Sequence, residues 1–138
     1  MLTGKLEHTL DAKNRITIPA KHREALGAPC MLVMGTLGNL MLFPLSRWEA
    51  MIRDINLRPI EERNELRDYA FSVSAEVTPD SQGRIVIPQS HIEYAQIRSN
   101  VTIIGNDEYD AIWSTEVWEA RCTANAEDRK RKLRSIGF

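Results

Sequence analysis

The sequence predicts a mainly β fold with short helices, of the α+β class, built from two copies of one unit. Residues 6–24 return as residues 75–93, with nine identities in 19 aligned positions, and both copies contain Asp-x-x-x-Arg followed by Ile-x-Ile-Pro. Internal similarity of this kind predicts a repeated structural unit. A unit of about 50 residues buries too little surface to be stable alone. We therefore expect the two copies to share one core.

Each copy begins with two short segments of strand character. Residues 6–10 and 15–18 alternate apolar and polar side chains, which is the period of a half-buried strand. The four residues between them make a connection of hairpin length. We expect a hairpin in which Leu6 and Leu10 pack beside the two isoleucines of the second segment.

The connection carries residues that can shape a tight turn. An aspartate at the start of a turn can accept backbone N–H groups of that turn. Asn and Gly tolerate a positive φ far better than most residues. Each turn is expected to hold an arginine where the second strand begins. The loop-orienting residues are Asp11, Asp80 and Gly83, with Asn14 at the position of Gly83 in the first copy, and the arginines are Arg15 and Arg84.

Prolines, glycines and apolar runs mark the next elements. Pro19 and Pro88 end the second strands and suit the start of a helix. The first of these helices covers 21–26 and can end at Gly27. Apolar, β-prone runs that end near glycines predict further strands. These strands are 31–34 and 40–43 in the first copy, and 101–104 and 111–113 in the second.

Two helices are expected in the middle of the chain. Ser46 and Glu49 have the spacing of a capping box ahead of a helix to about Ile55. Pro59 opens a charged, amphipathic helix to about Phe71. The residues of this second helix expected to face inward are Ile60, Leu66, Tyr69 and Ala70.

The copies also share aromatic and histidine positions. Residues 35–50 align with 105–120, which matches Trp48 to Trp118. We expect these tryptophans to lie in the core or in a subunit interface. His22 and His91 occupy matched positions, and a structural role on the short helices is the expectation for both.

The charge of the chain is nearly balanced but unevenly distributed. Its net charge of −1 argues against a generic nucleic-acid binder. Residues 11–24 carry four basic and two acidic side chains, a net charge of +2. Residues 80–93 carry one basic and two acidic side chains, a net charge of −1. Residues 121–138 carry six and two, or +4. We therefore expect a polyanion to contact the first copy more than the second. The basic tail is either a solvated end or a non-specific DNA contact.

Several classes of protein are disfavoured by the sequence. Cys30 and Cys122 are far apart, which suits reduced cytosolic thiols. We find no signal peptide, no membrane span, no zinc-type Cys/His spacing, no nucleophile motif and no phosphate-cradling glycine loop. We expect no catalytic residue, no cofactor, no metal and no small-molecule substrate.

The duplicated Asp-x-x-x-Arg and Ile-x-Ile-Pro segments resemble the two signature segments of the MraZ family. The resemblance runs from Gly4 and His8 through Trp118-Glu119, with Asn14 in place of the glycine usual in the first loop. It implies two AbrB-like (SpoVT-type) units that interleave as a pseudo-dimer, in a duplicated swapped-hairpin β-barrel. We assign the first unit to 5–47, a helical connector to 48–75, the second unit to 76–119 and the basic C-terminal tail to 120–138.

The resemblance also implies a function. Members of this family are bacterial transcriptional regulators that form ring-shaped homo-oligomers and bind short G-rich direct repeats in double-stranded DNA. Their sites lie upstream of the division and cell-wall gene cluster, which includes their own gene, and they generally act as repressors. The implied location is cytoplasmic and nucleoid-associated. The residues expected to contact DNA are Arg15, Arg84, Lys13, Asn14, Lys21 and Arg23.

Two other interpretations stay open at this level. Arg15 and Arg84 can simply form salt bridges with the aspartates of their loops. The chain can also be a protein-interaction module, similar to AbrB-type antitoxins that bind DNA weakly and neutralise a toxin through a C-terminal extension. Two fused units argue against that second interpretation, whereas the unmatched tail keeps it in view.

Overall fold

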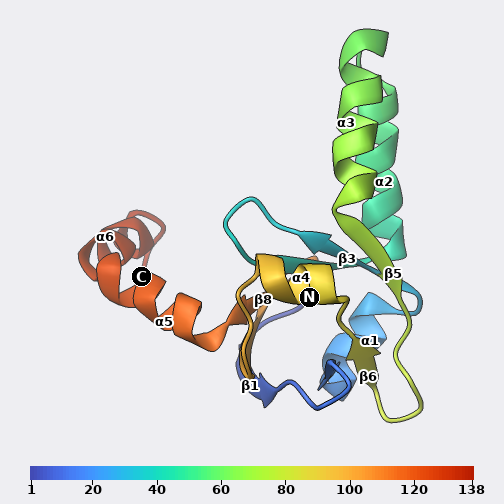
Figure 1. The fold of residues 1–138 in the computed structure, drawn as a ribbon. Coiled ribbons are helices and arrows are strands. Elements are labelled where there is room, and N and C mark those ends of the chain that lie inside the picture. Colours follow the sequence, from blue (N-terminus) through green and yellow to red (C-terminus); the bar gives the residue numbers. More distant parts are fainter.

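The computed structural model describes residues 1–138 and confirms the α+β class (Figure 1). A six-stranded antiparallel sheet, in the order β1-β7-β8-β4-β3-β5, faces a separate two-stranded ribbon of β2 and β6. The strands are β1 (Lys5–Thr9), β2 (Arg15–Thr17), β3 (Cys30–Met34), β4 (Leu40–Pro44), β5 (Ser74–Val77), β6 (Arg84–Val86), β7 (Asn100–Asn106) and β8 (Tyr109–Ser114). The helices are α1 (Ala20–Leu26), α2 (Leu45–Asn56), α3 (Ile60–Ser72), α4 (Gln89–Tyr94), α5 (Thr115–Ala124) and α6 (Ala126–Ser135).

The two copies interleave through their strands. β1 of the first copy pairs with β7 of the second, and β5 of the second pairs with β3 of the first. The predicted hairpin between the first two segments is therefore wrong as a strand pair. The turn closes through the Asp11 N–H, which donates to the Arg15 carbonyl at 3.0 Å, but the strands then separate because each finds its partner in the other copy. The order of the sheet is linear, and its end strands β1 and β5 do not pair with each other.

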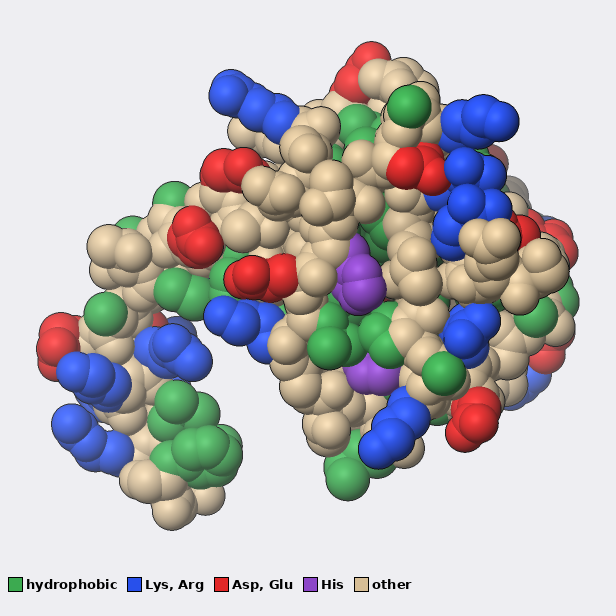
Figure 2. Space-filling view, turned by 90° about the horizontal axis from the view of Figure 1, so that it is seen from below, with side chains coloured by type: hydrophobic (Ala, Val, Ile, Leu, Met, Phe, Trp, Pro, Cys, Tyr) green, Lys and Arg blue, Asp and Glu red, His purple; other side chains and the backbone are tan.

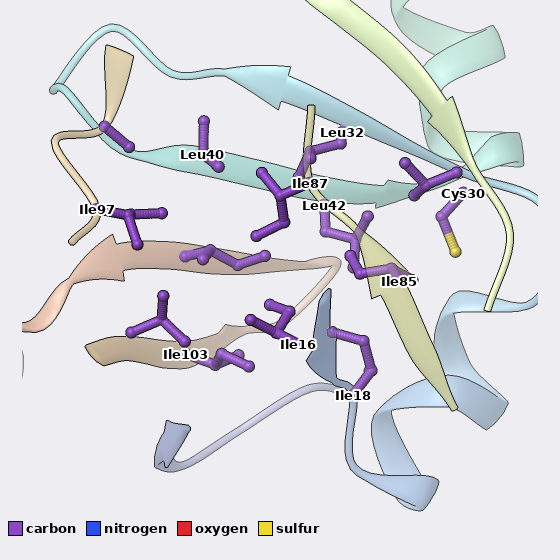
Figure 3. Close-up of a cluster of buried hydrophobic side chains, with 14 of the residues drawn as sticks. Ile16, Ile18, Cys30, Leu32, Leu40, Leu42, Ile85, Ile87, Ile97 and Ile103 are labelled. Carbon is purple, nitrogen blue, oxygen red and sulfur yellow. The ribbon is translucent and has the colours of Figure 1, made fainter. Parts of the chain in front are cut away.

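The core lies between the ribbon and the sheet (Figure 3). The isoleucines of both Ile-x-Ile segments are at most 1 % exposed and meet side chains of the sheet, among them Leu32, Leu42 and Ile103. Leu6 and Leu10 pack against this cluster, which confirms the expected packing. The duplicated motif thus places a pair of core residues from each copy at the centre of one shared core.

Both short helices start after the predicted prolines, and α1 ends at the predicted glycine. α1 and α4 begin directly after Pro19 and Pro88, and Gly27 ends α1 with a φ of 70°. The predicted capping box at Ser46 and Glu49 is wrong, because α2 already begins at Leu45 and no side chain caps it. Pro44 occupies the N-cap position of α2 and leaves Ser46 inside the first turn.

Helices α2 and α3 form an arm that rises from one end of the sheet (Figure 1). Trp48 is buried at its base and meets Phe71 edge to face, with ring centroids 5.5 Å apart. The inward orientation predicted for Ile60 and Tyr69 is wrong, since these side chains are 56 % and 61 % exposed. Ile60 lies at the far end of the arm, where α3 packs along α2 beyond the sheet and the core offers it no surface. Tyr69 lies in the last turn of α3, and its hydroxyl donates to Glu65 Oε1 of the same helix at 2.9 Å.

The basic C-terminal segment is helical and extends to the side of the body opposite the arm (Figure 1). α5 has its own cap, because the Ser114 hydroxyl accepts the Val117 N–H at 3.3 Å. Trp118 lies 5.5 Å from Trp113, and the Arg121 guanidinium lies 5.3 Å above the Trp113 ring. None of the helices combines the length and the apolar character needed to cross a bilayer.

Both matched histidines have structural partners. His91 Nε2 lies 3.2 Å from the carbonyl oxygens of Leu32 and Val73. His22 Nδ1 lies 2.8 and 2.9 Å from the two carboxylate oxygens of Asp110, a residue that is fully buried. Asp110 corresponds to Leu40 in the alignment of the copies, so the His–Asp pair exists on one side of the pseudo-dimer only.

Candidate nucleic-acid interface

The first loop is held by one aspartate. Asp11 Oδ1 accepts the backbone N–H groups of Lys13 and Arg15 at 2.9 Å each, and Oδ2 accepts Arg15 Nε at 2.7 Å. Asn14 closes the turn at a φ of 60° and donates its N–H to the Asp11 carbonyl at 3.0 Å. The contacts fix the Nε edge of the Arg15 guanidinium, and the side chain remains 25 % exposed.

The second loop repeats this geometry within 0.1 Å. Asp80 Oδ1 accepts the N–H groups of Gln82 and Arg84 at 2.9 Å, and Oδ2 accepts Arg84 Nε at 2.8 Å. Gly83 takes the left-handed position at a φ of 78°, and the Arg84 side chain is 29 % exposed. The predicted Asp–Arg salt bridge is thus present in both loops. It is compatible with DNA contact, because only Nε of each arginine is bonded and the terminal nitrogens can act as a bidentate fork.

The loop aspartates should titrate below the usual range. The Arg15 backbone N–H is the main cause that lowers the pKa of Asp11, and the Arg84 N–H does the same for Asp80. Because the pKa is lowered in the folded state, the stabilisation from these contacts is complete above the pKa of an unfolded aspartate, about 3.9. This stabilisation is lost as pH falls through the lower pKa of the folded state. Carboxyl NMR titration is expected to give both aspartates low pKa values. Arg15→Ala keeps the backbone N–H and removes the side-chain hydrogen bond and its charge, so it should raise the pKa of Asp11 part of the way while that of Asp80 stays low. Equal pKa values for Asp11 in the wild type and the variant would contradict the contact between the Arg15 side chain and Asp11.

The ribbon brings the two loop arginines to one surface. In the β2–β6 pair, Arg15 lies opposite Val86 and Arg84 lies opposite Thr17. Diagonal neighbours in such a pair are about 7–8 Å apart, and residues two apart on a strand share a face. Ile16 and Ile85 fill the buried face, so the exposed face consists of Arg15, Thr17, Arg84 and Val86.

The other predicted contact residues divide into two groups. Lys13 and Lys21 are exposed and can reach a polyanion. Asn14 is partly engaged within the chain, since its Nδ2 donates to Gln89 Oε1 of α4 at 3.3 Å. Arg23 lies against Gly83 of the second loop. The structure therefore brings all six predicted residues to the two loops and to the helix that follows the first of them.

Basic side chains on the face that carries the loops form one small group and not a broad basic surface. Figure 2 shows the molecule from below, with several Lys and Arg side chains adjoining one another at the upper right and the others standing apart among acidic side chains. This distribution agrees with the net charge of −1. Recognition of a polyanion by this face would depend on a few placed arginines and lysines, because long-range attraction by a large basic patch is absent from it.

Sequence reasoning missed two residues of this surface. Thr17 and Val86 stand between the arginines on the exposed face of the ribbon, and Val86 is 56 % exposed. The alternation around Ile16 and Ile85 contains the signal, since a residue beside a buried isoleucine points outward. The partner strand was the missing information, because β2 and β6 are far apart in the chain.

Comparison with known proteins adds a family to this geometry. The model of the family described as "MraZ protein, putative antitoxin-like" matches residues 1–68 and 70–134. A protein of Roseiflexus sp. (strain RS-1) is 37% identical over the full length of both chains. Proteins of Clostridium acetobutylicum and Thermoanaerobacter sp. (strain X514) are 39% and 42% identical, and the matches cover 86% of this chain and 84% and 85% of theirs. Each of the three is named "Transcriptional regulator MraZ".

Proposed function

The chain belongs to the MraZ family, and we propose that it is a DNA-binding transcriptional regulator that reads DNA with the β2–β6 ribbon. The observation that carries this proposal is the pair of nearly identical Asp–Arg loops, which present two arginines diagonally on one exposed face. The major groove of B-DNA admits a two-stranded ribbon, and an arginine fork pairs with O6 and N7 of guanine. Two pre-oriented forks on a two-stranded ribbon therefore support the proposal.

The residues have distinct roles in this proposal. Asp11, Asp80 and Gly83 shape the loops, and they reduce the freedom that the arginines lose on binding. Lys13 and Lys21 contact phosphates, which position a protein on the duplex without reading the bases. Asn14 supports the first loop through its φ of 60° and its bond to Gln89.

The finer biological role is supported by the family. We propose a repressor that binds short G-rich direct repeats upstream of the division and cell-wall gene cluster, including its own gene. A ring-shaped homo-oligomer would offer several ribbons to regularly spaced repeats, and the linked contacts would gain by effective concentration. Such avidity would explain how a chain of net charge −1 binds DNA strongly. The proposed location is the cytoplasm, at the nucleoid, and no catalytic step is part of the proposal.

Binding to DNA from upstream of the gene for this chain tests the proposal directly. Fluorescence anisotropy with that fragment and a scrambled fragment, across a salt series, should show tight binding to the native fragment alone. The affinity should fall as salt rises, because phosphate contacts release counterions. Equal weak binding to both fragments would contradict the proposal and favour the antitoxin-like alternative, for which a pull-down of a small protein partner is the next experiment.

A further inference from the structure

Arg23 belongs to the first copy but lies on the loop of the second. On the basis of the proposed function, we propose that Arg23 is the phosphate-binding group of the second loop, contributed across the pseudo-dimer. The second copy has only Arg84 as a basic residue in the stretch 80–93, against two acidic side chains. The interleaved fold supplies the missing cation from α1.

The contact is between the guanidinium and the tip of the turn. A Cβ atom on Gly83 would lie 2.1 Å from Arg23 Nη1, 2.4 Å from Cζ and 2.7 Å from Nε. Gly83 is buried although it stands at the end of a loop, whereas Asn14 at the matching position is partly exposed. The Arg23 side chain therefore covers the second loop, and only a residue without a Cβ leaves it this space.

The chain anchors this arrangement on both sides. The Ile18 N–H donates to the Gly83 carbonyl at 2.9 Å, which ties the second loop to the segment that leads into α1. The Arg23 N–H donates to the Pro19 carbonyl at 2.9 Å. Arg23 thus stands one helical turn beyond the point where the second loop is bonded, and its side chain returns over that loop.

The opposite side of the pseudo-dimer is built differently. The Ile87 N–H donates to the Asn14 carbonyl at 2.8 Å, so the backbone tie is the same. The side-chain contact there is between Asn14 and Gln89, and the position that matches Arg23 is Ile92, which is buried. At this position of the short helix only the second loop receives a cation from the other copy, while the first loop carries Lys13 itself.

The Arg23 guanidinium has no partner of its own in the chain. Arg15 and Arg84 each bond an aspartate through Nε, whereas Arg23 Nε is buried without a hydrogen-bond partner. Packing on Gly83 holds the group, and its charge takes part in none of the ion pairs of the structure. A partly exposed, unneutralised cation beside Arg84 is suited to a phosphate of DNA bound at that loop.

Double-mutant cycles on DNA binding assign Arg23 to a loop. Arg23→Ala should weaken binding to the native and the scrambled fragment by the same factor and reduce the salt slope by about 1, as expected for one phosphate contact. Its effect should couple to that of Arg84→Ala and add independently to that of Arg15→Ala. Coupling of Arg23→Ala to Arg15→Ala alone, or an unchanged affinity and salt slope in Arg23→Ala, would overturn the inference. The proposed function would still stand in either case, provided that the wild-type chain binds the native fragment specifically.

The packing on Gly83 has its own test. Asn accepts the positive φ, as Asn14 does, but brings a Cβ into the Arg23 contact. Gly83→Asn should therefore weaken binding in the wild-type background and have little effect in Arg23→Ala. An equal effect of Gly83→Asn in both backgrounds would overturn the role of Arg23 on this loop. A wild-type chain that binds neither fragment would overturn this inference together with the proposed function.

Discussion

Replacement of Arg15 by alanine is expected to lower the affinity for a native promoter fragment by roughly tenfold to a hundredfold per ribbon. The estimate follows from the discrimination of about 1–3 kcal/mol that one bidentate arginine–guanine pair provides. Arg15 has its Nε edge fixed by Asp11 at 2.7 Å, so its fork is oriented before DNA arrives. Removal of the arginine also leaves the Asp11 carboxylate on the face that approaches phosphates. Anisotropy on native and scrambled fragments measures the loss.

Three variants make this result specific. Arg84→Ala should weaken specific binding less, because residues 80–93 carry a net charge of −1 where 11–24 carry +2. Arg15→Lys should keep part of the non-specific affinity but lose sequence discrimination, since an ammonium is a point charge and not a fork. Arg47→Ala, which removes an arginine that is ion-paired with Glu108 at 2.9 Å, is the control and should bind normally. Normal binding by both Arg15→Ala and Arg84→Ala would show that the loops do not read DNA.

Replacement of His22 by alanine is expected to cost about 3–5 kcal/mol of the free energy of unfolding, the range for removal of one partner of a buried pair. Asp110 is fully buried, and both of its oxygens lie within 2.9 Å of His22 Nδ1. Burial raises the pKa of Asp110, and the hydrogen bond from His22 opposes that rise. Without the imidazole, the buried Asp110 carboxyl group loses its hydrogen bond to His22, and α1 loses this bond to β8. Urea unfolding followed by circular dichroism measures the change.

The matched substitutions separate the pair from simple packing. Asp110→Leu combined with His22→Leu should recover most of the lost stability, because apolar replacement of a whole buried pair is often neutral, and Leu40 occupies the corresponding position in the first copy. His8→Ala, on the partly exposed strand β1, should cost little. A loss below about 1 kcal/mol in His22→Ala, similar to an ordinary surface substitution, would show that the pair contributes little to the fold.

Local features of the fold were predictable because they depend on neighbouring residues. The Asp-x-x-x-Arg turn, the positive φ at Asn14 and Gly83, and the end of α1 at Gly27 each involve residues within a few positions of one another. The exposed state of Ile60 and Tyr69 was not predictable in the same way. The helical period indicates which residues share a face, but it does not show whether any part of the protein covers that face.

The contacts between copies were predictable only through family resemblance. The alternation in 6–10 and 15–18 predicts strands but does not specify that β1 pairs with β7 or β2 with β6. For the same reason the placement of Arg23 on Gly83 was not foreseen, since the two residues belong to different copies and meet only after the strands have exchanged. Each loop of the site is therefore shaped by residues close together in the sequence, whereas the arrangement of the two loops depends on contacts between distant residues.

The exchange of strands also affects the order in which the protein can form during translation. Lys5 pairs with Ile104, so β1 leaves the ribosome long before its partner strand exists. At a synthesis rate of about 5–20 residues per second, the N-terminal strand waits for roughly 5–20 s without its hydrogen-bond partner. The nascent first copy is therefore an incomplete structure with open strand edges, and the sheet reaches its native pairing only when the second copy has emerged.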